Sequence, residues 1–304
     1  MTLRVVHHPA YVAPMPPGHR FPMGKFGAVM ARLLADGVVT PDAIAVPEPA
    51  PEPWLELAHT PAYVRAVLDR TLDATAVRRI GFPITAAVVR RSRAASGGTV
   101  LAARLALEHG LACNTAGGSH HAFAGFGAGF CVFNDVAVAA RVLLSEGRVS
   151  RILVVDLDVH QGDGTAAIFA DEPRVITFSV HCRTNFPVRK QQSDLDIALD
   201  PAVEDHAYLT MLAERLPGLL EDGRPDLAFF NAGVDTHADD RLGRLAMTEA
   251  GLWRREQLVV DACLGRGIPV VGVLGGGYAS DLETLARLHT IQHRVASASL
   301  RRYA

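Results

Sequence analysis

Short apolar runs alternate with longer amphipathic stretches along the 304 residues of this chain. The runs are rich in Val, Ile, Leu and Phe and are bounded by turn residues, which is typical of strands buried on both faces of a parallel sheet. The amphipathic stretches between them predict helices that cover the sheet. The predicted strands span residues 3–6, 111–115, 151–157, 175–180, 227–231 and 269–274, and the predicted helices span residues 25–34, 60–72, 85–109, 136–146, 206–220, 248–264 and 281–297.

This alternation favours a single α/β domain over residues 1–304, because no internal repeat and no linker divides the chain. Residues 41–53 are rich in Pro, Ala and Glu and predict a surface loop. Thr60 and Pro61 form a good cap and first turn for the helix that follows them. The pair Gly97-Gly98 weakens the middle of the long helix.

The composition narrows the range of partners. The chain is 49% hydrophobic and 20% charged, which supplies a large core and argues against disorder. The formal net charge is −2 and both signs are scattered along the chain, so we expect no direct binding to nucleic acid or to an acidic membrane. Lys25 and Lys190 are the only lysines, and we attribute the preference for arginine to genome composition.

The sequence also predicts a cytoplasmic location. Residues 1–17 lack a charged start followed by an apolar core, so we expect no secretory signal. Charges or glycines interrupt every apolar stretch before the ~20 residues that a membrane span needs. Four widely spaced cysteines without a CxxC pair favour reduced thiols.

Polar residues follow the carboxyl ends of the predicted strands, where open α/β sheets bind their ligands. The first cluster contains Asp156, Asp158 and His160. If the strand conformation persists, these side chains point to the same side, because side chains alternate along a strand. Burying them together is costly without a cation, and their donors suit Zn²⁺, with Fe²⁺, Co²⁺ or Mn²⁺ as substitutes. The alternative is a strand-end turn with capping aspartates.

A second apolar strand is followed by Asp235. A single Asp at a strand end is usually a cap or a turn residue, but beside the first cluster it becomes a candidate third ligand. Asp158, His160 and Asp235 would leave one coordination position open, as catalytic zinc requires. Two carboxylates would neutralise the zinc charge and leave a Lewis acid that polarises a carbonyl.

The third cluster is the pair His120-His121, in a glycine-rich loop after another predicted strand. Two adjacent histidines there favour general acid–base chemistry over a structural role. Asp156 and Asp163 can each accept a hydrogen bond from one imidazole and fix its tautomer.

The fourth cluster is a glycine run, residues 275–277, that ends at Tyr278. Such a loop can cradle phosphate, but no GKS/T sequence and no lysine at a helix start follows it. The alternative, which the other three clusters favour, is a loop that presents Tyr278 so that its hydroxyl can donate to a developing oxyanion.

Together these motifs resemble the histone deacetylase superfamily, from about residue 18 to residue 279. Four further stretches look most like bacterial relatives of the class IV deacetylases: residues 18–22 (GHRFP), 185–187 (NFP), 193–196 (SDLD) and 240–243 (DRLG). The resemblance implies the arginase/deacetylase fold, a three-layer domain with a parallel sheet of about eight strands. The motifs shared with the superfamily are His120-His121, Gly129-Phe130-Cys131, Asp156-x-Asp158-x-His160, Asp235 and Gly275-Gly276-Gly277-Tyr278.

The resemblance implies two cation sites. The catalytic Zn²⁺ would be held by Asp158, His160 and Asp235. A structural K⁺ is implied near Asp156, Asp158, His160, Ser179 and Val180.

It also implies roles in proton transfer and substrate binding. His121, paired with Asp163, would be the proton-shuttling base and acid, and His120, paired with Asp156, would act mainly electrostatically. Tyr278 would donate to the substrate carbonyl and then to the oxyanion. The walls of a narrow channel for the acyl-lysine arm would be Gly129, Phe130 and Phe186.

Two features depart from the family pattern. The chain offers no counterpart of the rim aspartate with which class I members grip the substrate backbone. Residues 122–128 are also small and apolar, which would suit a longer acyl chain.

The implied activity is hydrolysis of Nε-acyl-lysine in proteins or peptides. Alternatives are an amidohydrolase for acetylpolyamines or other small acylamines, and a non-catalytic protein that retains the pocket as a sensor. An arginase-type ureohydrolase is disfavoured, because its binuclear manganese site uses Asp-x-His-x-Asp where this chain has Asp156-x-Asp158-x-His160. The sequence leaves the oligomeric state open.

Overall fold

A computed structural model describes residues 2–303 and is centred on an eight-stranded sheet. The strands are β1 (Arg4–Val6), β2 (Ile44–Ala45), β3 (Leu111–Asn114), β4 (Ile152–Asp156), β5 (Val175–Cys182), β6 (Leu195–Leu199), β7 (Leu227–Asn231) and β8 (Val270–Val273). Their order is β2-β1-β3-β8-β7-β4-β5-β6, and all neighbours are parallel. The predicted α/β architecture is confirmed.

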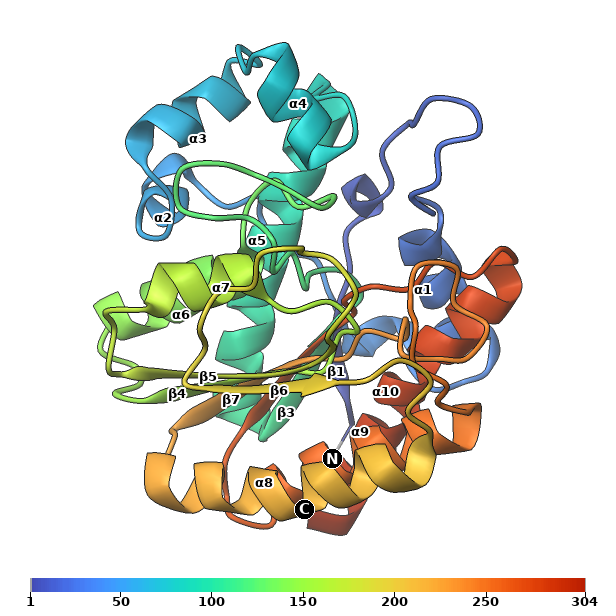
Figure 1. The fold of residues 1–304 in the computed structure, drawn as a ribbon. Coiled ribbons are helices and arrows are strands. Elements are labelled where there is room, and N and C mark those ends of the chain that lie inside the picture. Colours follow the sequence, from blue (N-terminus) through green and yellow to red (C-terminus); the bar gives the residue numbers. More distant parts are fainter. Residues whose placement is uncertain (1, 304) are drawn as a thin grey trace.

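Helices cover both faces of this sheet. They are α1 (Lys25–Ala35), α2 (Glu52–Glu56), α3 (Pro61–Leu68), α4 (Ala74–Ile80), α5 (Ala86–His109), α6 (Asp135–Ser145), α7 (Asp163–Phe169), α8 (Asp205–Gly223), α9 (Glu249–Leu264) and α10 (Leu282–Tyr303), with 3₁₀ turns η1 (Pro9–Tyr11) and η2 (Pro41–Ala43). Figure 1 shows α6 and α7 on one side of β4 and β5, and α8 on the other. Within residues 2–303 no helix combines the length and the apolarity needed to cross a bilayer.

Two strands, β2 and β6, were not predicted from the sequence, and both lie at edges of the sheet. The loop predicted over residues 41–53 is wrong in part, because it contains η2, β2 and the start of α2. β2 has only two residues and β6 is partly exposed along its length, so neither shows the continuous apolar run of a central strand. They are defined by backbone pairing with β1 and β5.

The helix boundaries follow caps present in the sequence. The Thr60 hydroxyl accepts a hydrogen bond from Tyr63 N at 3.4 Å, and the Thr85 hydroxyl accepts one from Val88 N at 3.2 Å. The first of these helices ends at Leu68, before the predicted residue 72. The helices α2, α4 and α7 were not predicted, since each is too short to show a clear helical period.

The glycine pair in α5 does not break the helix, and packing explains why it is there. A Cβ at Gly97 would come within 2.0 Å of Glu48 O, and one at Gly98 would come within 2.0 Å of the Tyr11 hydroxyl oxygen. The pair therefore lets two other segments lie directly on α5, at a cost in helix propensity of about 1 kcal/mol per glycine.

Candidate active site

The four polar clusters of the sequence meet at one edge of the sheet. They follow β3, β8, β7 and β4, which are neighbours in the strand order. Because these strands are parallel, their carboxyl ends lie together, with the loops that follow them (Figure 1).

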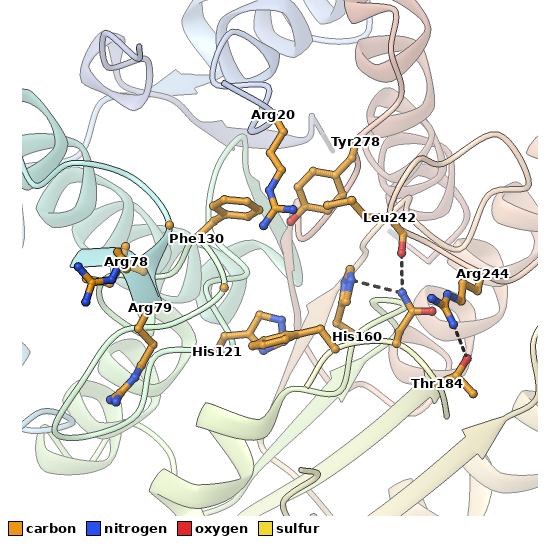
Figure 2. A pocket seen from close by; sticks show the side chains of 15 residues that line it. Arg20, Arg78, Arg79, His121, Phe130, His160, Thr184, Leu242, Arg244 and Tyr278 are labelled. Carbon is orange, nitrogen blue, oxygen red and sulfur yellow. Dashed lines mark hydrogen bonds between the residues drawn. The ribbon is translucent and has the colours of Figure 1, made fainter. Parts of the chain in front are cut away.

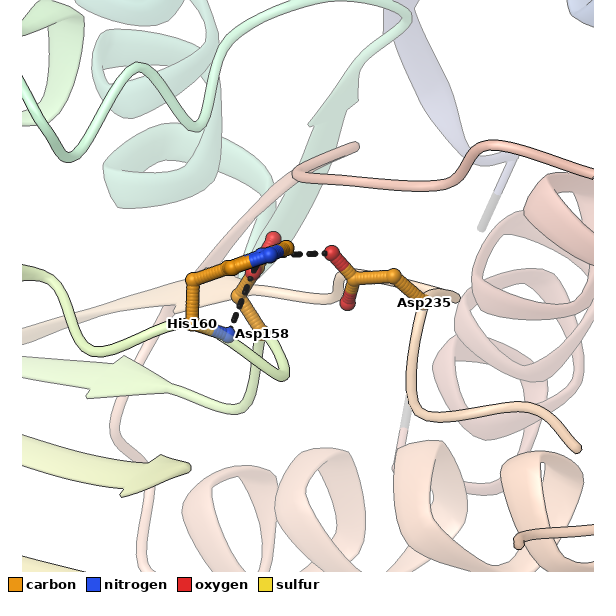
Figure 3. Close-up of side chains that lie close together, drawn as sticks. All are labelled: Asp158, His160 and Asp235. Atoms are coloured by element: carbon orange, nitrogen blue, oxygen red, sulfur yellow. Dashed lines mark hydrogen bonds and ion pairs between the residues drawn. The ribbon is translucent and has the colours of Figure 1, made fainter. Parts of the chain in front are cut away.

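Asp158, His160 and Asp235 are buried at this edge. One potential ligand atom from each residue lies within 4.8 Å of the other two. His160 Nδ1 is 2.9 Å from Asp158 Oδ1 and 3.1 Å from Asp235 Oδ2, and Figure 3 shows the imidazole reaching both carboxylates. Two carboxylates and one imidazole form a donor set that binds divalent cations such as Zn²⁺.

The electrostatics of this triad also favour a cation. Burial raises the pKa of Asp235 to about 7, and the charge of Asp158 adds to the rise. Burial opposes ionisation of Asp158 as well, but His120 and His160 hold the pKa of this carboxyl well below its usual range. Two buried carboxylates at this separation need positive charge beside them. The residues therefore fit a divalent metal ion.

The path of the chain to these ligands differs from the sequence prediction. β4 ends at Asp156, so the strand does not persist to His160. Instead Asp156 Oδ1 accepts a hydrogen bond from Asp158 N at 3.2 Å, and Asp158 Oδ1 accepts one from His160 N at 2.9 Å. These consecutive turns, in which an aspartate binds the backbone two residues on, bring Asp158 and His160 to Asp235.

His120 and His121 form the two pairs that the sequence predicted. His120 Nδ1 lies 2.7 Å from Asp156 Oδ2, and His121 Nδ1 lies 2.6 Å from Asp163 Oδ1. Burial lowers the pKa of His121 to about 4, and the charge of His120 adds to this effect. Burial acts in the same direction on His120, but the attraction of nearby carboxylates, Asp156 first, outweighs it and raises the pKa to about 9. Because the two pKa values are shifted in opposite directions, the two adjacent rings can have different protonation states and different roles.

Tyr278 and His121 flank His160, a proposed metal ligand. Their ring centroids lie 6.2 and 5.8 Å from that of His160, and both side chains line the cavity drawn in Figure 2. Burial raises the pKa of Tyr278 well above its ordinary value, and the charges of Asp158 and Asp235 add to the rise. The hydroxyl therefore keeps its proton and can donate a hydrogen bond.

The loop before Tyr278 passes very close to the triad. A Cβ at Gly276 would come within 2.0 Å of Asp235 Oδ2, so only glycine allows this approach. Gly276 N donates to Asp158 Oδ2 at 2.6 Å, which ties the loop to a proposed metal ligand.

A cavity of about 380 Å³ lies beside the triad, and His160 is the triad residue that lines it. Its wall includes the three predicted channel residues, Gly129, Phe130 and Phe186. Phe186 packs edge-on against His121, with ring centroids 4.8 Å apart. Residues 122–128 are all described and none lines the cavity, so the cavity does not support the expectation that they accommodate a longer acyl chain, which stays a prediction. Their backbone packs at the start of α3, where Thr60 N donates to Ala124 O.

Two of the residues implied for K⁺ line one small cavity. Asp156 and Ser179 pair on adjacent strands, and both line this cavity of about 10 Å³. Asp158, His160 and Val180 do not line it. The potassium site stays a prediction.

Three supporting residues were not assigned a role from sequence. Lys25 is buried, and its Nζ donates to Gly275 O at 2.9 Å. Lys190 Nζ donates to Asn185 O at 2.7 Å in the loop that carries Phe186. Asp240 Oδ2 accepts from Tyr278 N at 2.7 Å. The sequence did contain signals, since the chain has only these two lysines and Asp240 opens the DRLG motif.

Comparison with known proteins identifies clear relatives. The family model described as histone deacetylase domain matches residues 19–293. An uncharacterized protein of Picosynechococcus is 55% identical over 97% of this chain and 99% of its own length. Histone deacetylase 2 of Arabidopsis thaliana is 31% identical over 91% of this chain and 76% of its own, and a probable deacetylase of Archaeoglobus fulgidus is 30% identical over 92% and 82%.

A solved structure shares the fold. The crystal structure of the HDA15 HD domain aligns with a TM-score of 0.81 at 23% identity, covering 98% of this chain and 88% of that one. At this identity the likeness supports the architecture of the sheet and its helices.

Proposed function

The chain belongs to the histone deacetylase family, and from this premise we propose that it is a zinc-dependent amidohydrolase that removes acetyl or longer acyl groups from the ε-amino group of lysine in proteins or peptides. Family membership implies a hydrolase. The use of zinc and the choice of acyl-lysine as the substrate go beyond what family membership implies. We take residues 1–304 as one catalytic domain.

The metal would be held by Asp158, His160 and Asp235, with Fe²⁺ or Co²⁺ as substitutes for Zn²⁺. When bound, the ion supplies a Lewis acid that polarises the amide carbonyl and lowers the pKa of water. The support is the buried donor set and the raised pKa of Asp235, which burial and the neighbouring carboxylate produce.

His121 is the proposed base and acid. Because burial holds its pKa low, the ring is neutral at pH 7 and can accept a proton from the attacking water. Asp163 faces Nδ1, so Nε2 is the nitrogen left for this transfer, and it then returns the proton to the departing amine. His120, held charged by Asp156, contributes electrostatically.

Tyr278 is the proposed hydrogen-bond donor to the substrate. Its protonated hydroxyl would donate to the carbonyl oxygen and then, more strongly, to the oxyanion that forms from it. Gly129, Phe130 and Phe186 would line the channel that admits the unbranched lysine arm.

One observation carries this proposal: His160 of the buried triad, His121 and Tyr278 line the same cavity. The test is hydrolysis by the zinc-loaded protein across acyl groups from acetyl to long fatty acyl, on lysine peptides and on polyamines. We expect release of the free lysine amine. Turnover of acetylpolyamines alone would overturn the lysine assignment, and tight hydroxamate binding without any hydrolysis would make the protein a sensor.

Two smaller assignments accompany the proposal. We place a structural K⁺ beside Asp156 and Ser179, supported by their pairing around a shared cavity. We place the protein in the cytoplasm, supported by four cysteines that are all free.

A further inference from the structure

Four arginines gather at the mouth of the cavity. Arg20 comes from the loop before α1, Arg78 and Arg79 come from α4, and Arg244 comes from the loop between β7 and α9. All four are exposed, and Figure 2 shows them on different sides of the opening. Residues far apart in the chain thus bring positive charge to one place, although the net charge of the whole chain is −2.

Each guanidinium is held by a neutral group. Arg20 Cζ lies 5.2 Å from the ring centre of Phe130, and Arg79 Cζ lies 4.6 Å from that of Phe126. These stacked positions restrain the side chains without neutralising their charge.

The other two guanidinium groups face hydroxyls. Arg78 Nη2 donates to Thr75 Oγ1 at 3.0 Å, and Arg244 Nη1 donates to Thr184 Oγ1 at 3.4 Å. Each arginine therefore retains an uncompensated charge.

No carboxylate of residues 2–303 lies within ion-pair distance of these four arginines, whereas Arg32, Arg174 and Arg266 elsewhere on the surface do pair with acids. The described lining of the cavity also contains no Asp or Glu. Asp73, at the start of α4, is attracted to Arg78 and Arg79, but its Oδ1 already caps that helix by accepting from two backbone N–H groups.

The floor of the cavity consists of His121, His160 and Tyr278, with the buried carboxylates behind them. It does not cancel the positive charge of the four arginines. With a divalent ion in the triad, the carboxylates of Asp158 and Asp235 balance the metal and leave the floor close to neutral. The positive potential at the mouth is therefore available to a ligand that enters.

We propose that the arginine mouth selects acylamines that carry a carboxylate at or beside the end of the arm opposite the acylated amine. This rests on the proposed function. An acyl-lysine inserts its unbranched arm and leaves its α-carbon outside the channel, so groups on and beside the α-carbon face the arginines. The carboxylate can come from the α-carboxyl group of a free acylated amino acid or from acidic residues that flank acyl-lysine in a peptide. Guanidinium groups bind both in the same way.

The same charges disfavour polyamines. An acetylpolyamine would bring ammonium groups to a mouth that already holds four positive charges without acidic partners, and like charges at such a site are repelled. The mouth therefore weighs against this alternative substrate class.

The test compares matched substrates of the zinc-loaded enzyme. One set is a peptide with acetyl-lysine flanked by Glu, by Gln or by Lys, and the other is Nα-blocked acetyl-lysine with a free carboxylate or with its amide. We expect kcat/KM to rise by about 3- to 10-fold for each favourable carboxylate and to fall below the neutral value for the Lys peptide. The two sets show which source of carboxylate the mouth prefers.

Substitutions of the arginines test whether these residues cause the preference for a carboxylate. The double variant Arg78→Gln/Arg79→Gln and the single variant Arg244→Gln should lower the Glu-to-Gln ratio of kcat/KM, and Arg78→Glu/Arg79→Glu should reverse it. Arg254, an exposed arginine on α9 that does not line the cavity, is the matched control, and Arg254→Gln should leave the ratio unchanged.

The outcomes separate this inference from the proposed function. Equal kcat/KM for Glu and Gln peptides in the wild-type enzyme would overturn the charge selection and leave the hydrolase intact. If no substrate is hydrolysed, the proposed function fails, and calorimetric affinities for the same peptides decide the inference: tighter binding of the Glu peptide, lost in Arg78→Gln/Arg79→Gln, upholds it, and equal affinities overturn it.

Discussion

At the floor of the cavity, buried ionisable groups have hydrogen-bonding partners, as in the pairs of His120 with Asp156 and His121 with Asp163. At the mouth, the arginines are exposed and, within residues 2–303, have no carboxylate partner. The floor can thus fix protonation states before a substrate arrives, whereas the mouth leaves its charges for the substrate to satisfy. We therefore propose that the reaction and the choice of substrate are carried by different parts of one cavity.

The largest effect is expected from removing a proposed metal ligand at the floor. Asp158→Ala leaves two donors in the triad, so we expect loss of the bound metal and activity below detection. Elemental analysis of the purified variant and its turnover measure this. Asp73→Ala, which removes an exposed helix cap, is the matched control and should keep the metal. Full metal content in Asp158→Ala would show that the ligands are misassigned.

His121→Ala should separate chemistry from metal binding. The variant loses the proposed base but none of the three ligands, so we expect kcat to fall by about 10²- to 10⁴-fold with the metal retained. The same two measurements check it. If activity and bound metal are lost together, His121 is needed to maintain the metal site, and the assignment as the proton-transferring base fails.

Tyr278→Phe removes one hydroxyl from the boundary between floor and channel. Loss of a single donor to the oxyanion typically lowers kcat by about 10²- to 10³-fold, with a much smaller change in KM. Steady-state kinetics on an acetyl-lysine peptide test this. Full turnover by Tyr278→Phe would contradict the proposed donor role.

The floor could be predicted from sequence to a large extent, for a topological reason. Each cluster follows an apolar strand, and parallel strands end at one edge, so Asp158, His160 and Asp235 could be grouped before any contact was known. The local path could not be predicted, because the turns after Asp156 depend on side chains that bind the backbone two residues on. The roles of these residues stay predictions.

The mouth could not be predicted, because it depends on contacts between distant parts of the chain. Arg20, Arg79 and Arg244 lie on separate segments, and the sequence shows only scattered charges of both signs. Attributing the scarcity of lysine to genome composition also concealed a pattern. Lys25 and Lys190 each hold a loop that carries a proposed site residue.

Lys25 supports the floor through a contact between distant parts of the chain. We expect Lys25→Met to lower kcat less than the substitutions at the floor. Its Nζ binds a carbonyl 250 positions away and lies 5.8 Å from the ring centre of Tyr278. Met keeps much of the side-chain length but cannot donate, so Gly275 loses its anchor and we expect kcat to fall by about 10-fold, as for other residues that orient a site.

A double-mutant cycle distinguishes positioning from general destabilisation. If Lys25 acts through Tyr278, Lys25→Met should cost much less in a Tyr278→Phe background than alone. Equal costs in both backgrounds would mean that the lysine supports the fold but not the donor. Thermal melting of all four proteins accompanies the kinetics.

The smallest expected effect is that of salt, and it tests the comparison most directly because it leaves the chain unchanged. Raising ionic strength from 0.1 to 1 M shortens the Debye length from about 10 to 3 Å, which weakens exposed charges far more than buried ones. We expect KM for the Glu-flanked peptide to rise by about 3-fold while its kcat stays constant, and the Gln-flanked peptide to change little. In Arg78→Gln/Arg79→Gln the rise should shrink. A parallel fall of kcat for both peptides would mean that salt acts on the floor, and the separation between the two regions would then fail.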